Sequence, residues 1–498
     1  MITKVLPTIF RLLAFLAVLS MAGPLLAQEE EAGPSEEVEL TLDQKINEAI
    51  APMTNSVSSI MFSGIEFSAD KKTHGAISFE GLALHDPNLN GDGTDARERI
   101  ILPFIVIWLA GGAIFFTIFM KFINFRGFRQ AIRITKGVYD NPDDPGEVTH
   151  FQALSAALSG TVGLGNIAGV ALAVSIGGAG ATFWMILAGL LGMTSKFVEC
   201  TLGVHYREID ENGVVSGGPM YYLSRGLAEK GLPGLGKILA ALSAILILGG
   251  TIGSGALFQV NQATQQFAET FQLATGWSFF VDSGWSFGLI FAALAGFVII
   301  GGIRKIVHVT EFLVPIMGIL YLGAAIVIIG FNLGELPGAF AAIFDGAFSA
   351  EGVTGGFIGV LVQGMRRATF SNEAGIGSAA IAHAAAKTKE PIAEGLVALL
   401  EPFVDTVIVC TATALVIITT GLHEAEGLDG ITRTSAAFAT VFDWFPYLLT
   451  VAVVLFAFST AITWFYYGQR SLVYLTGPSR GIDFTYKAAF LGAMVVGS

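Results

Sequence analysis

Ser159-Gly160-Thr161-Val162-Gly163-Leu164-Gly165-Asn166-Ile167-Ala168-Gly169 lies in the middle of an apolar run that extends from about residue 151 to residue 176. Such a run is long enough to cross a bilayer, which takes a helix of about 20 residues. Its glycines disfavour a continuous helix, because each costs about 1 kcal/mol relative to alanine. Unwound backbone at membrane depth is tolerated only where protein or a watery cavity covers it. The stretch therefore predicts a spanning helix broken near the midplane, whose free peptide groups are available to an ion and a substrate.

The composition of the chain is typical of a polytopic membrane protein. Of its 498 residues, 53% are hydrophobic and 13% are charged. The net charge of -13 comes largely from an acidic segment at 29–39, and nothing in the sequence suggests nucleic-acid binding. Cys200 and Cys410 both lie in apolar runs, so we expect buried free thiols and neither a disulfide nor a metal site.

The N-terminal part of the chain is expected to lie outside the cytoplasm. Residues 1–27 resemble a secretory signal peptide, with a basic flank, a short apolar stretch and a small residue for cleavage; the alternative is an extra anchor. Residues 28–100 form a polar extracytoplasmic region, in which 75–84 alternates weakly like a strand. A stretch from Asp86 imitates a calcium loop, but Arg97 stands where a bidentate glutamate is required, which favours a plain turn.

Apolar runs predict an all-α polytopic membrane protein with nine spans and the beginning of a tenth, each near the length needed to cross. The expected spans are 101–122, 151–176, 182–206, 237–260, 287–303, 308–331, 355–386, 391–420 and 441–470, with a tenth from about 484. Lysines and arginines cluster after every odd-numbered span, whereas the alternate loops carry only Arg433. Because basic loops stay cytoplasmic, we expect the N-terminus on the outer side of a bacterial plasma (inner) membrane.

A second glycine-rich break echoes the first. Phe370-Ser371-Asn372-Glu373-Ala374-Gly375-Ile376-Gly377-Ser378 interrupts the seventh span, and paired interrupted segments in two halves indicate a transporter site. The spacing of five spans predicts repeats of opposite orientation, the first at 151–331 and the second at 355–498. The span at 101–122 is then an extra N-terminal transmembrane helix. Because Ser498 falls within the fourth span of the second repeat, we expect a C-terminally truncated sequence.

The sequence lacks the motifs of ATP-driven pumping and of catalysis. There is no G-x-x-x-x-G-K-[ST] loop, no HExxH, no paired metal-ligand spacing and no nucleophile–base constellation. We therefore expect a carrier driven by an ion gradient, and not an enzyme. The alternative is a channel or a membrane sensor, for which 28–100 would serve as a receptor.

Charged residues inside the spans need an explanation. Lys196 and Glu199 are three apart and are expected to neutralise each other on one helix face. Glu373 lies in the second break, and Glu401 and Asp405 are four apart in the eighth span. Carboxylates in membranes are functional candidates, so Glu401 and Asp405 would serve proton coupling, the alternative to a metal cation. Structural hydrogen bonding to unwound backbone explains them equally well.

The first break offers groups for both a carboxylate and a cation. The amides of Leu164 and Gly165, at the start of a half-helix, suit an anionic group, and Asn166 can donate or accept there. A small hard cation takes oxygen ligands, for which the candidates are Ser159, Thr161 and Val162. Helix packing explains the small residues but not the added threonine and asparagine, so we expect a binding function.

Two further polar patches lie in apolar spans. Gln259 ends the fourth span, and Ser459, Thr460 and Trp464 lie in the ninth. Thr460 and Trp464 are four apart and share one helix face, where a hydroxyl would serve a cation and an indole would wall a small side chain. The alternative is that the hydroxyls of Ser459 and Thr460 bond back to their own helix.

Three strings together resemble the signatures of the alanine or glycine:cation symporter family: 159–169, Gly217-Gly218-Pro219-Met220-Tyr221-Tyr222 and 370–378. The resemblance covers about 101–498. It implies eleven spans in a leucine-transporter-like fold, with inverted five-helix repeats after the extra helix; the eleventh span is missing here, and 28–100 departs from the family pattern. It also implies import of small neutral amino acids, alanine or glycine, with sodium across the lipid bilayer. The oligomeric state is left open.

The resemblance further implies roles for individual residues. The substrate carboxylate would lie near Gly163, Leu164, Gly165 and Asn166. The pocket would be lined by Gln259, Phe370, Thr460 and Trp464. The co-transported sodium ion would be held by Ser159, Val162, Ser459 and Thr460.

Overall fold

The computed structural model describes residues 64–70, 78–83, 97–348 and 356–498, apart from 426 and 429. The expected signal segment and the start of the calcium-like turn at Asp86 lie outside the described residues. The chain divides into two compact units, Met1–Ile107 and Trp108–Ser498, each with its own internal contacts.

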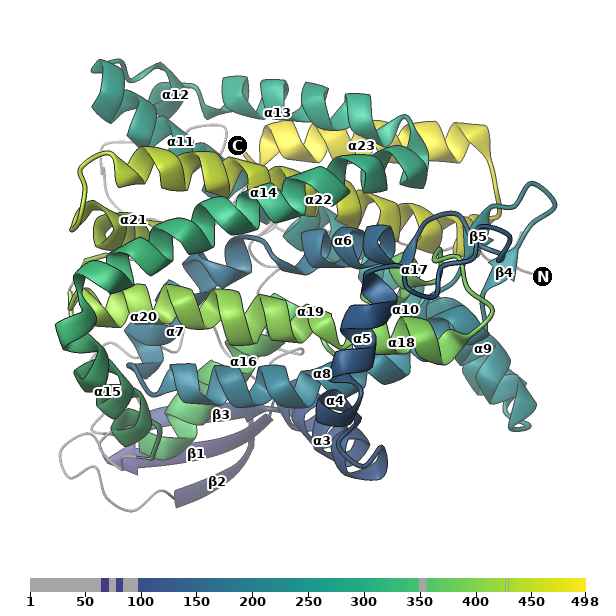
Figure 1. Ribbon diagram of the computed structural model, residues 1–498, viewed down its shortest axis with the longest axis horizontal. Coiled ribbons are helices and arrows are strands. Elements are labelled where there is room, and N and C mark those ends of the chain that lie inside the picture. The colour runs from purple at the N-terminus through teal and green to yellow at the C-terminus, as the bar shows by residue number, and fades with distance from the viewer. Residues whose placement is uncertain (1–63, 71–77, 84–96, 349–355, 426, 429) are drawn as a thin grey trace, which may run out of the picture. The chain divides into compact units, whose positions relative to one another are not determined.

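The first unit contains an antiparallel three-stranded sheet, so the chain is mostly helical and not all-α. The strands are β1 (Gly64–Asp70), β2 (Ser78–Ala83) and β3 (Arg97–Pro103), in the order β2-β1-β3 (Figure 1). In the register, Gly64 pairs with Ala83 on one side and with Pro103 on the other. The weak alternation at 75–84 predicted only β2. β3 has no alternation of apolar and polar residues, whereas residues 65–70 of β1 alternate and were overlooked.

The second unit is built from helices, which begin with α3 (Phe104–Phe119) at the boundary between the units. The helices between residue 120 and residue 348 are α4 (Ile123–Arg126), α5 (Phe128–Thr135), α6 (His150–Thr161), the short turn η2 (Leu164–Asn166), α7 (Ala168–Gly177), α8 (Ala181–His205), α9 (Pro219–Glu229), α10 (Pro233–Gly250), η3 (Thr251–Phe258), α11 (Gln259–Thr275), α12 (Phe279–Asp282), α13 (Gly284–Ile299), α14 (Gly302–Phe331), η4 (Leu333–Glu335) and α15 (Leu336–Phe348). From residue 356 onward the helices are α16 (Gly356–Asn372), α17 (Ala379–His383), α18 (Pro391–Ala398), α19 (Leu400–Pro402), η5 (Phe403–Cys410), α20 (Thr411–Thr419), α21 (Gly430–Ala439), α22 (Phe445–Thr476) and α23 (Arg480–Val496). A small hairpin of β4 (Glu208–Ile209) and β5 (Val215–Ser216) follows α8.

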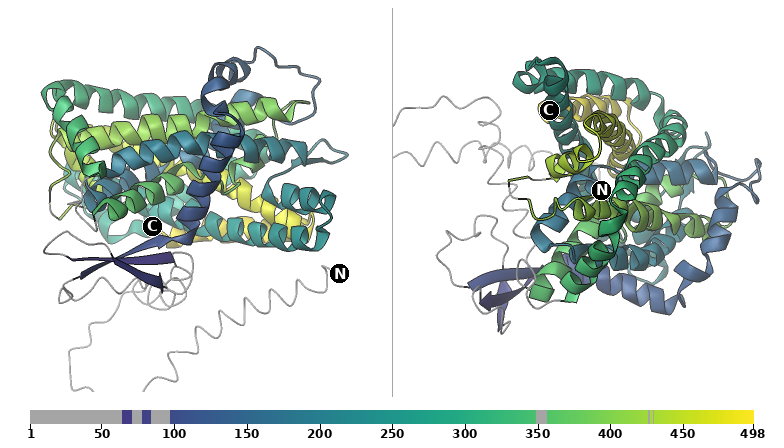
Figure 2. Two further views of the ribbon diagram at one scale, coloured as in Figure 1. Left: turned by 90° about the horizontal axis from the view of Figure 1, so that it is seen from below. Right: turned by 60° about the vertical axis from the view of Figure 1, so that its left-hand side comes forward.

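Five helical stretches of the described residues are long and apolar enough to cross a bilayer: Ala181–His205, Pro233–Thr275, Gly302–Phe331, Pro391–Thr419 and Phe445–Thr476. The bent pair of α6 and α7 makes a sixth when it is taken as one span. Most long helices of this unit run along a common direction, as expected for spans of one bilayer (Figure 2). Four further spans were expected, and shorter helices lie at their places: α3, α13, α16 and α23. That these four helices cross the bilayer stays a prediction.

Three expected spans differ from the helices observed. The first, expected at 101–122, is helical only from Phe104, because Arg97–Pro103 form β3. The fourth, expected to end at 260, belongs to a helical stretch that continues to Thr275, because α11 stays helical although it is polar. The seventh, expected at 355–386, ends as a helix at Asn372 and resumes only for the five residues of α17. Apolar runs indicate which residues face lipid, whereas the end of a helix depends on local hydrogen bonding.

The helices of the second unit approach one another closely through small residues. α8 packs against α16, α17 and α18, and α22 packs against α6, α10, α11 and α14. A Cβ added to Gly203 would lie 2.8 Å from Ala380 O, and one added to Gly364 would lie 2.6 Å from Ala181 O. Close backbone approach of this kind supplies the packing contacts that hold membrane helices together.

Candidate functional site

The first break has the geometry that its glycines predict. α6 begins with a capping box between Thr149 and Gln152, and α7 leaves the break at 57° to α6. A single 3-10 turn, η2, follows Gly163 between the two helices. The N–H groups of Leu164 and Gly165 have no hydrogen-bond acceptor among the described residues. Two buried donors are therefore open at the break, an arrangement that suits a carboxylate.

Five of the residues predicted to bind substrate meet at this break. A Cβ added to Gly163 would lie 2.7 Å from Thr460 Oγ1 and 3.4 Å from Gln259 Oε1. One added to Gly165 would lie 3.5 Å from the ring of Phe370. Gln259 Oε1 is buried without a hydrogen-bond partner in the described part of the chain. Three helices, α22, α11 and α16, therefore each bring one of these side chains to the unwound backbone.

Asn166 is fully buried, and its amide is engaged within the protein. Its Oδ1 accepts from Gly163 N at 2.9 Å, and its Nδ2 donates to Asp405 Oδ1 at 2.7 Å. Ser371 Oγ donates to the other oxygen of Asp405 at 2.7 Å, and Cys410 Sγ lies 3.3 Å from Asn166 Nδ2. These bonds fasten the first break to α16 and η5. Asn166 therefore shapes the break, and its direct contact with a substrate carboxylate stays a prediction.

An oxygen-rich cluster joins the end of α6 to α22. Ser159 Oγ donates to Ser459 O at 2.7 Å, and Thr460 Oγ1 donates to Ser159 O at 2.8 Å. Thr463 Oγ1 lies 3.1 Å from Ser159 Oγ. Thr463 was not among the sodium ligands expected from the sequence, although it lies four residues after Ser459 on the same helix face. Carbonyl and hydroxyl oxygens of this kind, next to an unwound segment, are the ligands that bind sodium in transporters.

Three other predicted residues lie around this cluster. The hydroxyl of Thr161 bonds to two carbonyls of its own helix, so it is used within α6. The carbonyl of Val162 has no donor among the described residues. Trp464 is buried; its Nε1 donates to Gly160 O at 3.2 Å, and a Cβ on Gly255 would lie 2.4 Å from its side chain. Trp464 therefore packs behind the end of α6, between that helix and η3.

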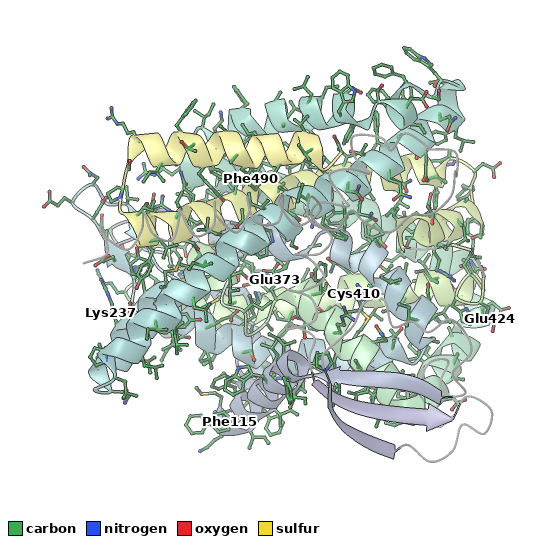
Figure 3. The ribbon with its side chains drawn as sticks, turned by 180° about the vertical axis from the view of Figure 1, so that it is seen from behind. Phe115, Lys237, Glu373, Cys410, Glu424 and Phe490 are labelled. Atoms are coloured by element: carbon green, nitrogen blue, oxygen red, sulfur yellow. The ribbon has the colours of Figure 1, made fainter. Side chains whose placement is uncertain are left out.

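The second break lies between α16 and α17. Gly375 and Gly377 both adopt a positive φ angle of 89°, which glycine reaches without a side-chain clash. Glu373 has a φ of 55°, in the left-handed region that residues with a side chain rarely adopt. The amides of Gly375 and Gly377 donate to Glu199 Oε2 at 3.2 and 3.0 Å. Figure 3 shows Glu373 and Cys410 inside the helical unit. A carboxylate of α8 therefore binds the free peptide groups of this break. This role was expected as an alternative for Glu373, Glu401 and Asp405, and not for Glu199, which was expected only to neutralise Lys196.

The string 217–222 packs against the second break. Gly218 has a φ of 108°, and a Cβ there would lie 2.5 Å from Ile381 Cγ1. A Cβ on Gly377 would lie 2.8 Å from the hydroxyl of Tyr222. Glycine is thus required on both sides of this contact.

Lys196 is fully buried between two carboxylates. Its Nζ lies 3.2 Å from Glu401 Oε2 and 3.6 Å from Glu199 Oε1. The expected neutralisation by Glu199 alone is therefore incomplete, because α19 brings Glu401 closer than the neighbour on the same helix. His383 Nε2 pairs with the other oxygen of Glu401 at 2.6 Å. Through Glu199, this ionic cluster connects α8 and α19 to the second break.

Cys200, His383 and Glu401 place one ligand atom each within 4.8 Å of one another, all of them buried. The ammonium of Lys196 already supplies a positive charge to Glu401, so a metal cation there would be repelled. We therefore assign no metal to these three residues. Cys200 and Cys410 are buried free thiols, as the sequence predicts.

Comparison with known proteins identifies relatives along most of the chain. A model described as "Sodium:alanine symporter family" matches residues 93–498. The chain is 38% identical over 396 residues to "Sodium/alanine symporter AgcS" of Methanococcus maripaludis, covering 78% of this chain and 84% of the relative. It is 34% identical over 405 residues to "Probable sodium/glutamine symporter GlnT" of Bacillus subtilis, covering 81% and 80%. The crystal structure of MhsT in complex with L-phenylalanine is similar with a TM-score of 0.48 and 15% identity, over 70% of this chain and 81% of that chain.

Proposed function

The chain belongs to the sodium:alanine symporter family, and from this premise we propose that it imports alanine and glycine with sodium by alternating access. The family and the relatives make it a multi-pass, cation-coupled amino-acid transporter and not an enzyme. The resemblance drawn from the three sequence strings is thereby confirmed. The choice of substrate, the coupling to sodium, the inward direction and the inverted repeats belong to the proposal.

One observation carries the proposal: the open amides of Leu164 and Gly165 lie on the same broken segment as the oxygen cluster around Ser159. A zwitterionic amino acid needs donors for its carboxylate, and sodium needs oxygen ligands. Because both groups belong to one break, the substrate carboxylate and the sodium ion would bind close together. Their opposite charges attract strongly in a site that excludes water, which couples the binding of one to the other.

The side chains around the break support a small substrate. Thr460 and Gln259 approach Gly163, and Phe370 approaches Gly165, so little space remains for a substrate side chain. The buried Oε1 of Gln259 has no partner among the described atoms and would accept a hydrogen bond from the substrate ammonium. These contacts favour alanine and glycine over longer amino acids.

The proposed function predicts that a sodium gradient drives uptake. The protein is reconstituted into proteoliposomes, and uptake of labelled alanine is measured with an inward sodium gradient and with equal sodium on both sides. We expect saturable accumulation only with the gradient. Equal uptake under both conditions would reject sodium coupling. Accumulation driven by an acid-outside gradient without sodium would favour proton coupling, and uptake that does not saturate would favour a channel.

A second prediction concerns the sodium ligands. Ser159→Ala removes the hydroxyl that joins Ser459 and Thr463. We expect the sodium concentration for half-maximal uptake to rise about tenfold, since a lost polar ligand of this kind costs about 1.4 kcal/mol. The control is Ser175→Ala, whose hydroxyl donates to Ala171 O of its own helix. An unchanged sodium dependence in Ser159→Ala would remove this residue from the site.

A further inference from the structure

One arginine binds the backbone of two segments that are far apart in the chain. Arg207 follows α8, and its two terminal nitrogens donate to four carbonyls at 2.6–2.8 Å. The acceptors are the carbonyls of Pro145, Ala384, Ala386 and Thr388. Burial lowers the pKa of Arg207 from its ordinary value, but a guanidinium stays charged in proteins. All four terminal N–H groups are engaged, in a planar fork that lysine cannot reproduce.

The two segments, 145–148 and 384–388, also pair directly with each other. Their hydrogen bonds run from Glu147 N to Ala385 O, from Lys387 N to Val148 O and from Thr388 N to Pro145 O, at 2.8, 2.8 and 3.2 Å. Val148 and Ala386 form a parallel β-bridge. A Cβ on Gly146 would lie 2.4 Å from Ala386 O, so the two backbones are in direct contact there.

A carboxylate connects the same regions a second time. Glu394 of α18 is fully buried, and its two oxygens contact His150 Nδ1 and His383 Nδ1. His150 is the first residue of α6, and His383 is the last residue of α17. The start of one broken helix and the end of the other are therefore held by one side chain.

All of these contacts lie at one end of the two broken spans. Segment 145–148 leads into α6 and so to the first break, whereas segment 384–388 leads back through α17 to the second. For a site between the breaks to open toward this end, we expect that the two hydrogen-bonded segments must separate. The distribution of lysine and arginine in the loops predicts that this end faces the cytoplasm.

We propose that Arg207 and the segments 145–148 and 384–388 form a latch that closes the transport site toward the cytoplasm and separates in each transport cycle. The inference rests on the proposed function, because only alternating access requires this end to open. Among the described residues, Arg207 has no hydrogen bond to a proposed substrate or sodium ligand, so it acts as a positioning residue. Because one side chain binds four carbonyls on two segments, the latch forms or breaks as a unit, as a two-state element requires.

A reversible cross-link tests whether the latch opens. The β-bridge partners Val148 and Ala386, replaced by cysteines, would lie about 5 Å apart, within the range that a disulfide spans. We expect the oxidised Val148→Cys/Ala386→Cys protein to bind alanine without transporting it, and dithiothreitol to restore uptake. Each single-cysteine variant, oxidised in the same way, is the control. Unchanged uptake by the cross-linked protein would overturn the proposal, because the latch would then be a fixed joint.

A weakened latch tests the same inference without a cross-link and without substrate. Arg207→Lys keeps the charge but loses the fork, and Arg129→Lys on the exposed side of α5 is the matched control. We expect Cys410 to react about tenfold faster with an impermeant maleimide added from the cytoplasmic side, because the open population rises. Peptide mass spectrometry separates Cys410 from Cys200.

The two proposals fail in different ways. An unchanged rate of Cys410 labelling in Arg207→Lys would overturn the latch, whatever the substrate is. If alanine binds to neither the reduced nor the oxidised cysteine pair, the proposed substrate is wrong. The labelling experiment still decides the latch in that case.

Discussion

Replacing Gly163 with alanine is expected to reduce sodium-dependent alanine uptake about a hundredfold, because overpacking at a contact of this kind costs up to about 3 kcal/mol. The added Cβ would lie 2.7 Å from Thr460 Oγ1 and 3.4 Å from Gln259 Oε1. It would therefore fill the space between the two side chains that flank the break. Uptake by the purified variant in proteoliposomes measures the effect, and size-exclusion chromatography shows whether the variant is folded.

The same sequence string supplies the matched control. Gly169 lies in α7, and a Cβ added there would meet no atom within 4 Å. Gly169→Ala is expected to transport like the parent, and to be slightly more stable because alanine favours a helix over glycine. Equal uptake by the Gly163 and Gly169 variants would show that the space beside Gly163 does not hold the substrate.

Replacing Lys196 with methionine is expected to destabilise the protein by about 3–5 kcal/mol, the usual effect of breaking a buried ion pair from one side. The ammonium lies 3.2 Å from Glu401 and 3.6 Å from Glu199, and its side chain is fully buried. Without it, two carboxylates remain in an apolar interior with less opposite charge. Thermal unfolding in detergent measures the loss as a lower Tm.

Two further variants separate this effect from a simple change of side-chain volume. Lys196→Met combined with Glu401→Gln removes one charge of each sign and is expected to recover part of the lost Tm. Lys230→Met changes an exposed lysine at the end of α9 and is expected to leave the Tm unchanged. If Lys196→Met and Lys230→Met unfold at the same temperature, the buried ion pairs contribute nothing to stability.

The two breaks could be predicted from local sequence because their cause is local. Glycine weakens a helix wherever it occurs, and its concentration at 159–169 corresponds to the 57° bend between α6 and α7. At the second break, Gly375 and Gly377 adopt the positive φ angles that other residues avoid. The family resemblance implied that Thr460 and Gln259 line one pocket, whereas the residues alone marked them only as separate polar patches in apolar spans.

The partners of buried polar groups could not be predicted, because they depend on long-range packing. Asn166 bonds to Asp405 across 239 residues of sequence, and helical periodicity contains no signal for that pairing. From their spacing of four residues, Glu401 and Asp405 were expected to lie on one helix face. In the structure Glu401 pairs with Lys196 and His383, whereas Asp405 bonds to Asn166. Thr463 could have been found from its spacing to Ser459.

The hydrogen bonds from Arg207 to the backbone could not be predicted from the sequence either. An arginine that follows a spanning helix usually marks a cytoplasmic loop, and nothing in the local sequence indicates that it binds four carbonyls. The carbonyl groups of 384–388 carry no side-chain signal, and they become acceptors only because the seventh span ends early.

The most direct test of the account is a structure determined with alanine and sodium bound. We expect the alanine carboxylate within hydrogen-bond distance of the amides of Leu164 and Gly165. We also expect a sodium ion among the oxygens of Ser159, Ser459 and Thr460. Alanine bound at another place, with the two amides of the first break still without an acceptor, would contradict the account.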